Sequence, residues 1–112
     1  MRGEMLKGHL DMLILSVLAR RPRHGYAIIE DLRATSRDAL DLPEGTLYPA
    51  LHRLERAGLV AGTWSEASGR RRKSYALTPL GMTTLTEERR TWTRFSAAVG
   101  AVLEEVPWPS IS

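Results

Sequence analysis

The chain has 112 residues, of which 43% are apolar, and its 16 Lys and Arg against 13 Asp and Glu give a formal net charge of +3. This length predicts one small domain with a modest core, which a second copy of the chain would help to complete. The absence of Cys excludes disulfides, thiolate metal sites and cysteine nucleophiles, and no apolar run approaches the roughly 20 residues that span a bilayer. We therefore expect a cytoplasmic protein that does not contact membranes.

Apolar residues recur at helical spacing in the first third of the chain. One stripe predicts a helix over residues 8–20: Leu10, Leu13, Ile14, Val17 and Leu18. Pro22 and Gly25 interrupt the pattern, and a second short amphipathic helix is expected over residues 25–36.

The third predicted helix has two different faces. Leu42 precedes Pro43, which suits a first helical position, and Gly58 predicts the end of the helix. One side of the helix is apolar: Leu47, Leu51 and Leu54. The opposite side carries Pro49, His52, Arg53 and Arg56. One face is therefore predicted to pack and the other to bind.

A β-hairpin is expected next. Residues 59–66 and 73–78 predict two short strands, joined by the polar run 67–72, so that the hairpin has a basic tip. Thr78 and Pro79 then predict the start of a last helix, which Pro107 ends.

The order of these elements predicts a mainly α fold with a small β-hairpin, namely a winged helix-turn-helix followed by one long C-terminal helix. We expect the winged helix-turn-helix to span residues 5–78, a dimerisation helix residues 79–106 and a tail residues 107–112. In this fold the third helix enters the major groove of DNA, while the cationic hairpin reaches phosphates or the minor groove beside it.

Four stretches of the chain then carry a specific pattern: residues 6–15 (LKGHLDMLIL), 24–29 (HGYAII), 45–55 (GTLYPALHRLE) and 69–78 (GRRRKSYALT). Together, in this order and at this spacing, they resemble the PadR family of bacterial transcriptional regulators. The resemblance implies a DNA-binding repressor that acts at a palindromic operator, with the C-terminal helix holding a homodimer together. The single C-terminal helix is similar to that of the family's short members.

The first group of candidate DNA-binding residues lies on the third helix. The Gly-Thr-Leu-Tyr-Pro segment leads the recognition helix in PadR-like proteins, and the candidates here are Thr46, Tyr48, Pro49, His52 and Arg53. Thr46 and Tyr48 can donate to phosphates, while His52 and Arg53 can reach base edges. Two alternatives stay open, since Tyr48 can instead be a packing residue and Arg53 a member of a surface ion pair.

The second group is the densest charge in the chain, formed by Arg70, Arg71, Arg72 and Lys73. Four of the 16 basic residues lie here, so the other 12 face 13 acidic residues and the whole surplus of charge falls on the hairpin. We expect this cluster to contact phosphates or the minor groove, where release of counterions favours binding; the alternative is a solvated hairpin tip. Because neighbouring side chains of a strand point to opposite sides, not all four need contact DNA, and we favour Arg71 and Arg72.

The apolar residues of the last helix, spaced as in a coiled coil, are expected to form the dimer interface: Leu85, Trp92, Phe95, Val99 and Val102. Trp92 follows Gly81 at the spacing seen in PadR-like multidrug regulators, some of which hold flat aromatic compounds between paired tryptophans. The resemblance therefore implies a second hypothesis, in which Trp92 and Phe95 bind a small aromatic effector.

A competing interpretation is a winged-helix module that binds protein. Its support is the acidic run Asp38, Asp41 and Glu44, which suits the dipole of the third helix but repels phosphates. An enzyme is not expected, because the three histidines are scattered and no metal-binding, paired-carboxylate or phosphate-loop pattern is present. No cofactor and no metal are predicted.

Overall fold

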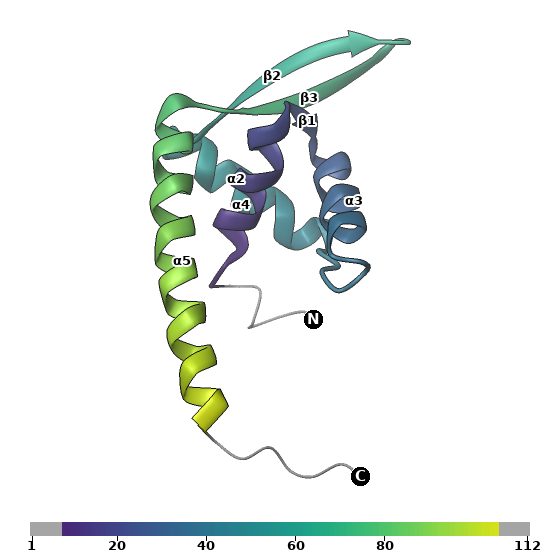
Figure 1. The fold of residues 1–112 in the computed structure, drawn as a ribbon. Coiled ribbons are helices and arrows are strands. Elements are labelled where there is room, and N and C mark those ends of the chain that lie inside the picture. The colour runs from purple at the N-terminus through teal and green to yellow at the C-terminus, as the bar shows by residue number, and fades with distance from the viewer. Residues whose placement is uncertain (1–7, 106–112) are drawn as a thin grey trace.

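The computed structural model describes residues 8–105. The elements are, in order, α2 (Leu10–Arg20), β1 (Arg23–His24), α3 (Gly25–Thr35), α4 (Glu44–Arg56), β2 (Val60–Ala67), β3 (Arg70–Leu77) and α5 (Pro79–Glu105). Helices α2, α3 and α4 form a body with the hairpin at one end, and α5 runs along one side and extends beyond the other helices (Figure 1). The predicted winged helix-turn-helix with a long C-terminal helix is confirmed. The stop at Pro107 and the tail lie outside the described residues.

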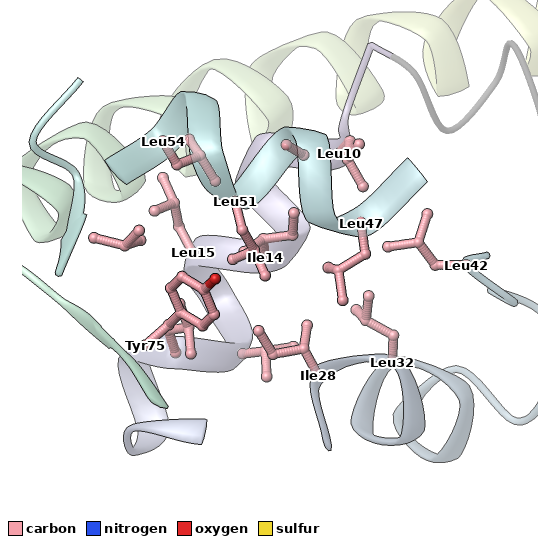
Figure 2. Packing of buried hydrophobic residues seen from close by; sticks show 14 of the residues in the cluster. Leu10, Ile14, Leu15, Ile28, Leu32, Leu42, Leu47, Leu51, Leu54 and Tyr75 are labelled. Atoms are coloured by element: carbon pink, nitrogen blue, oxygen red, sulfur yellow. The ribbon is translucent and has the colours of Figure 1, made fainter. Parts of the chain in front are cut away.

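The core lies where α2, α3, α4 and β3 meet. Figure 2 shows Ile14, Ile28, Leu51 and Tyr75 converging from these four elements, and each is at most 2% exposed. Burying one such side chain stabilises the fold by about 1.5–3 kcal/mol. Because the leucine face of α4 packs into this core, the opposite face of the helix lies at the surface, as the sequence predicts.

The boundaries of α4 follow from its sequence, with one shift. Pro43 is the N-cap residue, so the helix begins at Glu44, one residue later than expected. Gly58 ends it at a φ of +77°, a left-handed conformation that glycine adopts without strain. Pro49 lies inside the helix and lacks the N–H that would bond the Gly45 carbonyl four residues earlier.

The hairpin is longer and its turn tighter than the sequence analysis predicted. Strands β2 and β3 pair along their whole length, and only Ser68 and Gly69 form the turn, at φ values of 55° and 74°. Two consecutive residues at positive φ suit the twist of a two-residue hairpin. The predicted loop over 67–72 is therefore wrong. A third strand, β1, was also missed, because only Arg23 and His24 pair with β3.

The first turns of helix α5 pack one side against the body. The Gly81 N–H donates to Thr78 Oγ1 at 3.0 Å, which confirms Thr78 as the cap. Gly81 lies so close to the Leu59 carbonyl that a Cβ there would overlap it, and Leu85 is only 2% exposed. The first turns of α5 are therefore anchored on the body. Among residues 8–105, no helix combines the length and apolarity that crossing a bilayer requires.

Candidate nucleic-acid interface

A groove of about 1150 Å³ lies between the start of α3, one side of α4 and the hairpin. Five cationic side chains line it: Arg21, Arg23, Arg71, Arg72 and Lys73. Aromatic rings line it as well: Tyr26, Tyr48, Trp64 and Tyr75. The only acidic residues among the lining residues are Glu30 and Asp31, and Asp31 is paired with Arg23 at 2.7 Å. The groove therefore favours an anion.

The face of α4 that points away from the core is polar and accessible. Thr46, Pro49, His52 and Arg53 are exposed, as their positions on the helix predict. Arg56 is exposed on the same face, seven residues after Pro49, and no ion pair to it is found within residues 8–105. Arg56 therefore joins the candidates, although the helical pattern that placed it opposite the leucines had already indicated it.

Tyr48 lies at the edge of this face and packs against the start of α3. A Cβ at position 25 would stand 2.7 Å from both Tyr48 Cε1 and its hydroxyl oxygen, so the ring rests on the backbone of Gly25. The residue is half-buried, which agrees with a packing role, and it also lines the groove. The contact with Gly25 fixes the position of the Tyr48 ring, and the side chain can still contact a ligand bound in the groove.

The Arg53 side chain reaches from the exposed face of α4 to Asp11 on α2. Its Nη1 donates to both carboxylate oxygens of Asp11, at 2.9 and 2.8 Å. This hydrogen bond to Asp11 raises the pKa of Arg53, so the guanidinium stays charged. The ion pair is exposed and of modest strength, and Arg53 does not line the groove. In this structure Arg53 thus forms a surface ion pair with Asp11, which is the alternative that the sequence left open for it.

The four cations of the hairpin lie in different surroundings. Arg71 stacks on Trp64, with Cζ 4.6 Å from the ring centroid. Arg70 and Arg72 alternate with it along β3 and are exposed. Lys73 lies nearer the body, and its Nζ donates to Glu55 Oε1 at 2.8 Å. The surplus of charge at the end of the hairpin is therefore made by the arginines, while Lys73 is neutralised by its partner.

The Glu55–Lys73 pair is partly shielded from water, with side-chain exposures of 33% and 21%. The hydrogen bond between the two side chains lowers the pKa of Glu55 and raises the pKa of Lys73. Both groups are therefore charged at neutral pH, and each holds the other in its charged form.

The residues expected at a dimer interface divide into two sets. Leu85 is buried in the core of its own chain, which accounts for its apolar side chain without a partner. The other four are exposed on the free part of α5: Trp92 at 42%, Phe95 at 57%, Val99 at 38% and Val102 at 65%. Trp92 lies beside Phe95, with ring centroids 6.3 Å apart, and makes an edge-to-face contact with His9, with ring centroids 5.0 Å apart.

The structure thus brings together part of the predicted DNA-binding set. Tyr48, His52, Arg71, Arg72 and Lys73 line one groove, whereas Thr46, Pro49 and Arg53 lie on α4 outside it and Arg70 at the end of the hairpin. Sequence reasoning missed the contributions of Arg21, Arg23, Tyr26 and Trp64. Tyr26 lies in the HGY stretch that carried part of the family resemblance, which was a usable signal; nothing in the sequence placed the others.

Fold and groove together define a winged helix-turn-helix protein with a cationic surface beside its third helix. Residues 14–87 match the Transcriptional regulator PadR-like family, and the chain belongs to this family of transcriptional regulators. It is 38% identical over 87 residues to the transcriptional regulator Rv3488 of Mycobacterium tuberculosis, a match that covers 78% of each chain.

Solved structures agree with this membership. The chain is similar to a PadR family transcriptional regulator from Eggerthella lenta, with 36% identity and a TM-score of 0.81 over 92% of this chain and 88% of that one. It is also similar to a transcriptional regulator from Clostridium thermocellum, with 27% identity and a TM-score of 0.83 over 88% of this chain and 97% of that one.

Proposed function

We propose that this regulator is a repressor that binds double-stranded DNA as a homodimer at a palindromic operator. The observation that carries the proposal is the groove that α4 and the arginine-bearing hairpin border together. In the proposed complex, α4 lies in the major groove with Pro49, His52 and Arg56 toward the bases, and the hairpin lies on the flanking backbone or minor groove. Such a regulator works in the cytoplasm, beside the chromosome, and catalyses no reaction.

The homodimer is proposed from the free part of α5. Trp92, Phe95, Val99 and Val102 are exposed apolar residues at coiled-coil spacing, and pairing with a second α5 would remove them from water. We accordingly assign residues 5–78 to DNA binding and the helix within residues 79–106 to dimerisation. A two-fold dimer predicts two half-sites related by a dyad.

A gel shift with the DNA upstream of the protein's own gene tests the proposal. We expect a complex whose affinity falls steeply with salt. We also propose that Arg53 leaves the Asp11 pair in the complex and reaches a base edge, so an Arg53→Ala variant should prefer a different sequence. An intact dimer that shifts no duplex at low salt would instead favour the protein-binding module. Against that module, Asp41 of the acidic run is already paired with Arg33 at 2.8 Å.

A small flat aromatic effector is a second proposal, favoured by the exposed Trp92 ring beside Phe95. Bound between two copies of Trp92, the compound would quench tryptophan fluorescence and alter the dimer that holds both half-sites. Titrating planar dyes tests this. A Trp64→Phe variant keeps Trp92 and should still be quenched, whereas Trp92→Phe should lose the response. Equal quenching of both variants would refute binding at Trp92.

A further inference from the structure

A continuous row of side chains links the last turn of α4 to the outer half of the hairpin. Glu55 uses both of its carboxylate oxygens: Oε1 accepts from Lys73 Nζ at 2.8 Å, and Oε2 accepts from the backbone N–H of Gly62 at 3.2 Å. Lys73 belongs to β3 and Gly62 to β2. One carboxylate on the recognition helix therefore holds both strands of the hairpin.

The row continues from Lys73 toward the tip. Lys73 Nζ lies 5.7 Å from the centroid of the Trp64 ring and 5.2 Å from that of Tyr75. The Trp64 ring in turn carries the Arg71 guanidinium at 4.6 Å. Arg71, Trp64 and Lys73 lie on one face of the hairpin, and Glu55 connects this row to α4.

Gly62 shows how closely this row is packed. A Cβ at position 62 would overlap Lys73 Cε and stand 2.8 Å from Glu55 Oε2. A larger residue at position 62 would therefore require the ends of the Lys73 and Glu55 side chains to shift. The contact is therefore part of how the hairpin sits on the body.

We propose that Glu55 is a positioning residue for DNA recognition. It fixes the orientation of the hairpin against α4 and hence the distance between Arg71 and the base-facing side chains of the helix. DNA sites whose backbone and bases match that distance are then preferred. In this role Lys73 helps to orient the hairpin by its ion pair with Glu55, and it contacts no phosphate. The inference rests on the proposed DNA-binding function.

The consequence runs against simple electrostatics. Glu55→Gln removes a negative charge near the groove, so Coulomb's law alone predicts tighter DNA binding. The glutamine keeps an oxygen for the Gly62 N–H but loses the ion pair with Lys73. If the pair sets the geometry of the hairpin, specific binding weakens although the protein has become more positive.

The experiment uses two duplexes: one selected by the wild-type protein from a random-sequence pool, and one of scrambled sequence. Affinities are measured by fluorescence anisotropy for Glu55→Gln, Lys73→Gln and the double variant. Glu87→Gln, which makes the same charge change at an exposed site on α5, is the matched control. Thermal melting checks that each variant is folded.

We expect Glu55→Gln to bind the selected duplex about tenfold more weakly, the size of a lost hydrogen bond between charged groups, and the scrambled duplex no more weakly than wild type. Glu87→Gln should bind both at least as tightly as wild type. The double variant should be no weaker than either single variant, because both break the same contact.

Two results would overturn the positioning role. One is Glu55→Gln binding the selected duplex as tightly as Glu87→Gln; the other is losses that multiply in the double variant, which would mean that Lys73 contacts DNA directly. If Glu55→Gln fails to fold, Lys73→Gln decides alone: an unchanged salt slope with weaker specific binding supports the role, and a slope lowered by about one refutes it. A wild-type protein that selects no duplex refutes the proposed function itself.

Discussion

The arginines of the hairpin and Lys73 carry the same charge but should contribute unequally to DNA binding. Arg70, Arg71 and Arg72 are exposed and form no ion pair in the part of the chain that the structure describes, although Glu66 lies opposite Arg71 on β2. Lys73, in contrast, is neutralised by Glu55. Each phosphate contact adds about 0.9 to the slope of log affinity against log salt. Replacing Arg71 and Arg72 together by Gln should lower that slope by up to about 1.8, and Lys73→Gln should leave it unchanged.

The slope translates into an affinity ratio that is easy to measure. Between about 50 and 200 mM salt, a fourfold change, wild type should lose roughly twelve times more affinity than the Arg71→Gln/Arg72→Gln variant, since four raised to the power 1.8 is about 12. Anisotropy titrations on selected and scrambled duplexes provide the measurement, and the loss should be similar on both. An unchanged slope in the double variant, or a Lys73→Gln slope lowered as much as that of one arginine, would falsify the assignment of the arginines to phosphate contacts.

Three other changes have defined outcomes. Gly25→Ala should displace Tyr48 and lower the free energy of unfolding by about 1–3 kcal/mol in denaturant titrations, whereas Gly45→Ala, with open space around it, should not. Val99→Glu should shift the proposed dimer toward monomer in sedimentation, and an unaltered dimer would remove Val99 from the proposed interface. The hydrogen bond to Lys73 lowers the pKa of Glu55 in the folded protein. Ionised Glu55 therefore stabilises the fold above its ordinary pKa of 4.5, and this contribution is lost as pH falls through the lowered pKa of the folded state. Between neutral pH and about pH 3, the free energy of unfolding should fall more in wild type than in Glu55→Gln.

Local patterns were enough to predict the helices. The leucine spacing of α4 predicted both its buried face and its exposed face, because a short amphipathic helix can satisfy its apolar stripe in only one way. The hairpin was harder. Polar residues continue along β2 and β3 past the point where apolar alternation ends, so the strands looked shorter than they are. The two-residue turn at Ser68 and Gly69 was a signal that the sequence contained and that the basic run obscured.

The sequence predicted which types of residue form the candidate site, but not which acidic residues pair with its cations. Arg53 is held by Asp11, 42 residues away, and Lys73 by Glu55, 18 residues away. No periodicity reveals such pairs, since they arise only when the helices and the hairpin pack. The same limit applies to Leu85, because a seven-residue repeat does not distinguish a side chain buried in its own core from one buried against a partner.

The anchoring of α5 has a mechanical consequence. Its 27 residues form a rod of about 40 Å whose first turns are locked to the body by Gly81 and Leu85. Its second half carries the exposed stripe, whose middle lies about 12 residues, or roughly 18 Å, beyond Leu85. In the proposed dimer, a change of about 10° in the angle between a rod and its partner, acting over these roughly 18 Å, would move the attached body by roughly 3 Å, close to one base-pair step along the duplex. Small adjustments at the far end of α5 would thus be amplified into a different spacing between the two half-sites that the dimer can span.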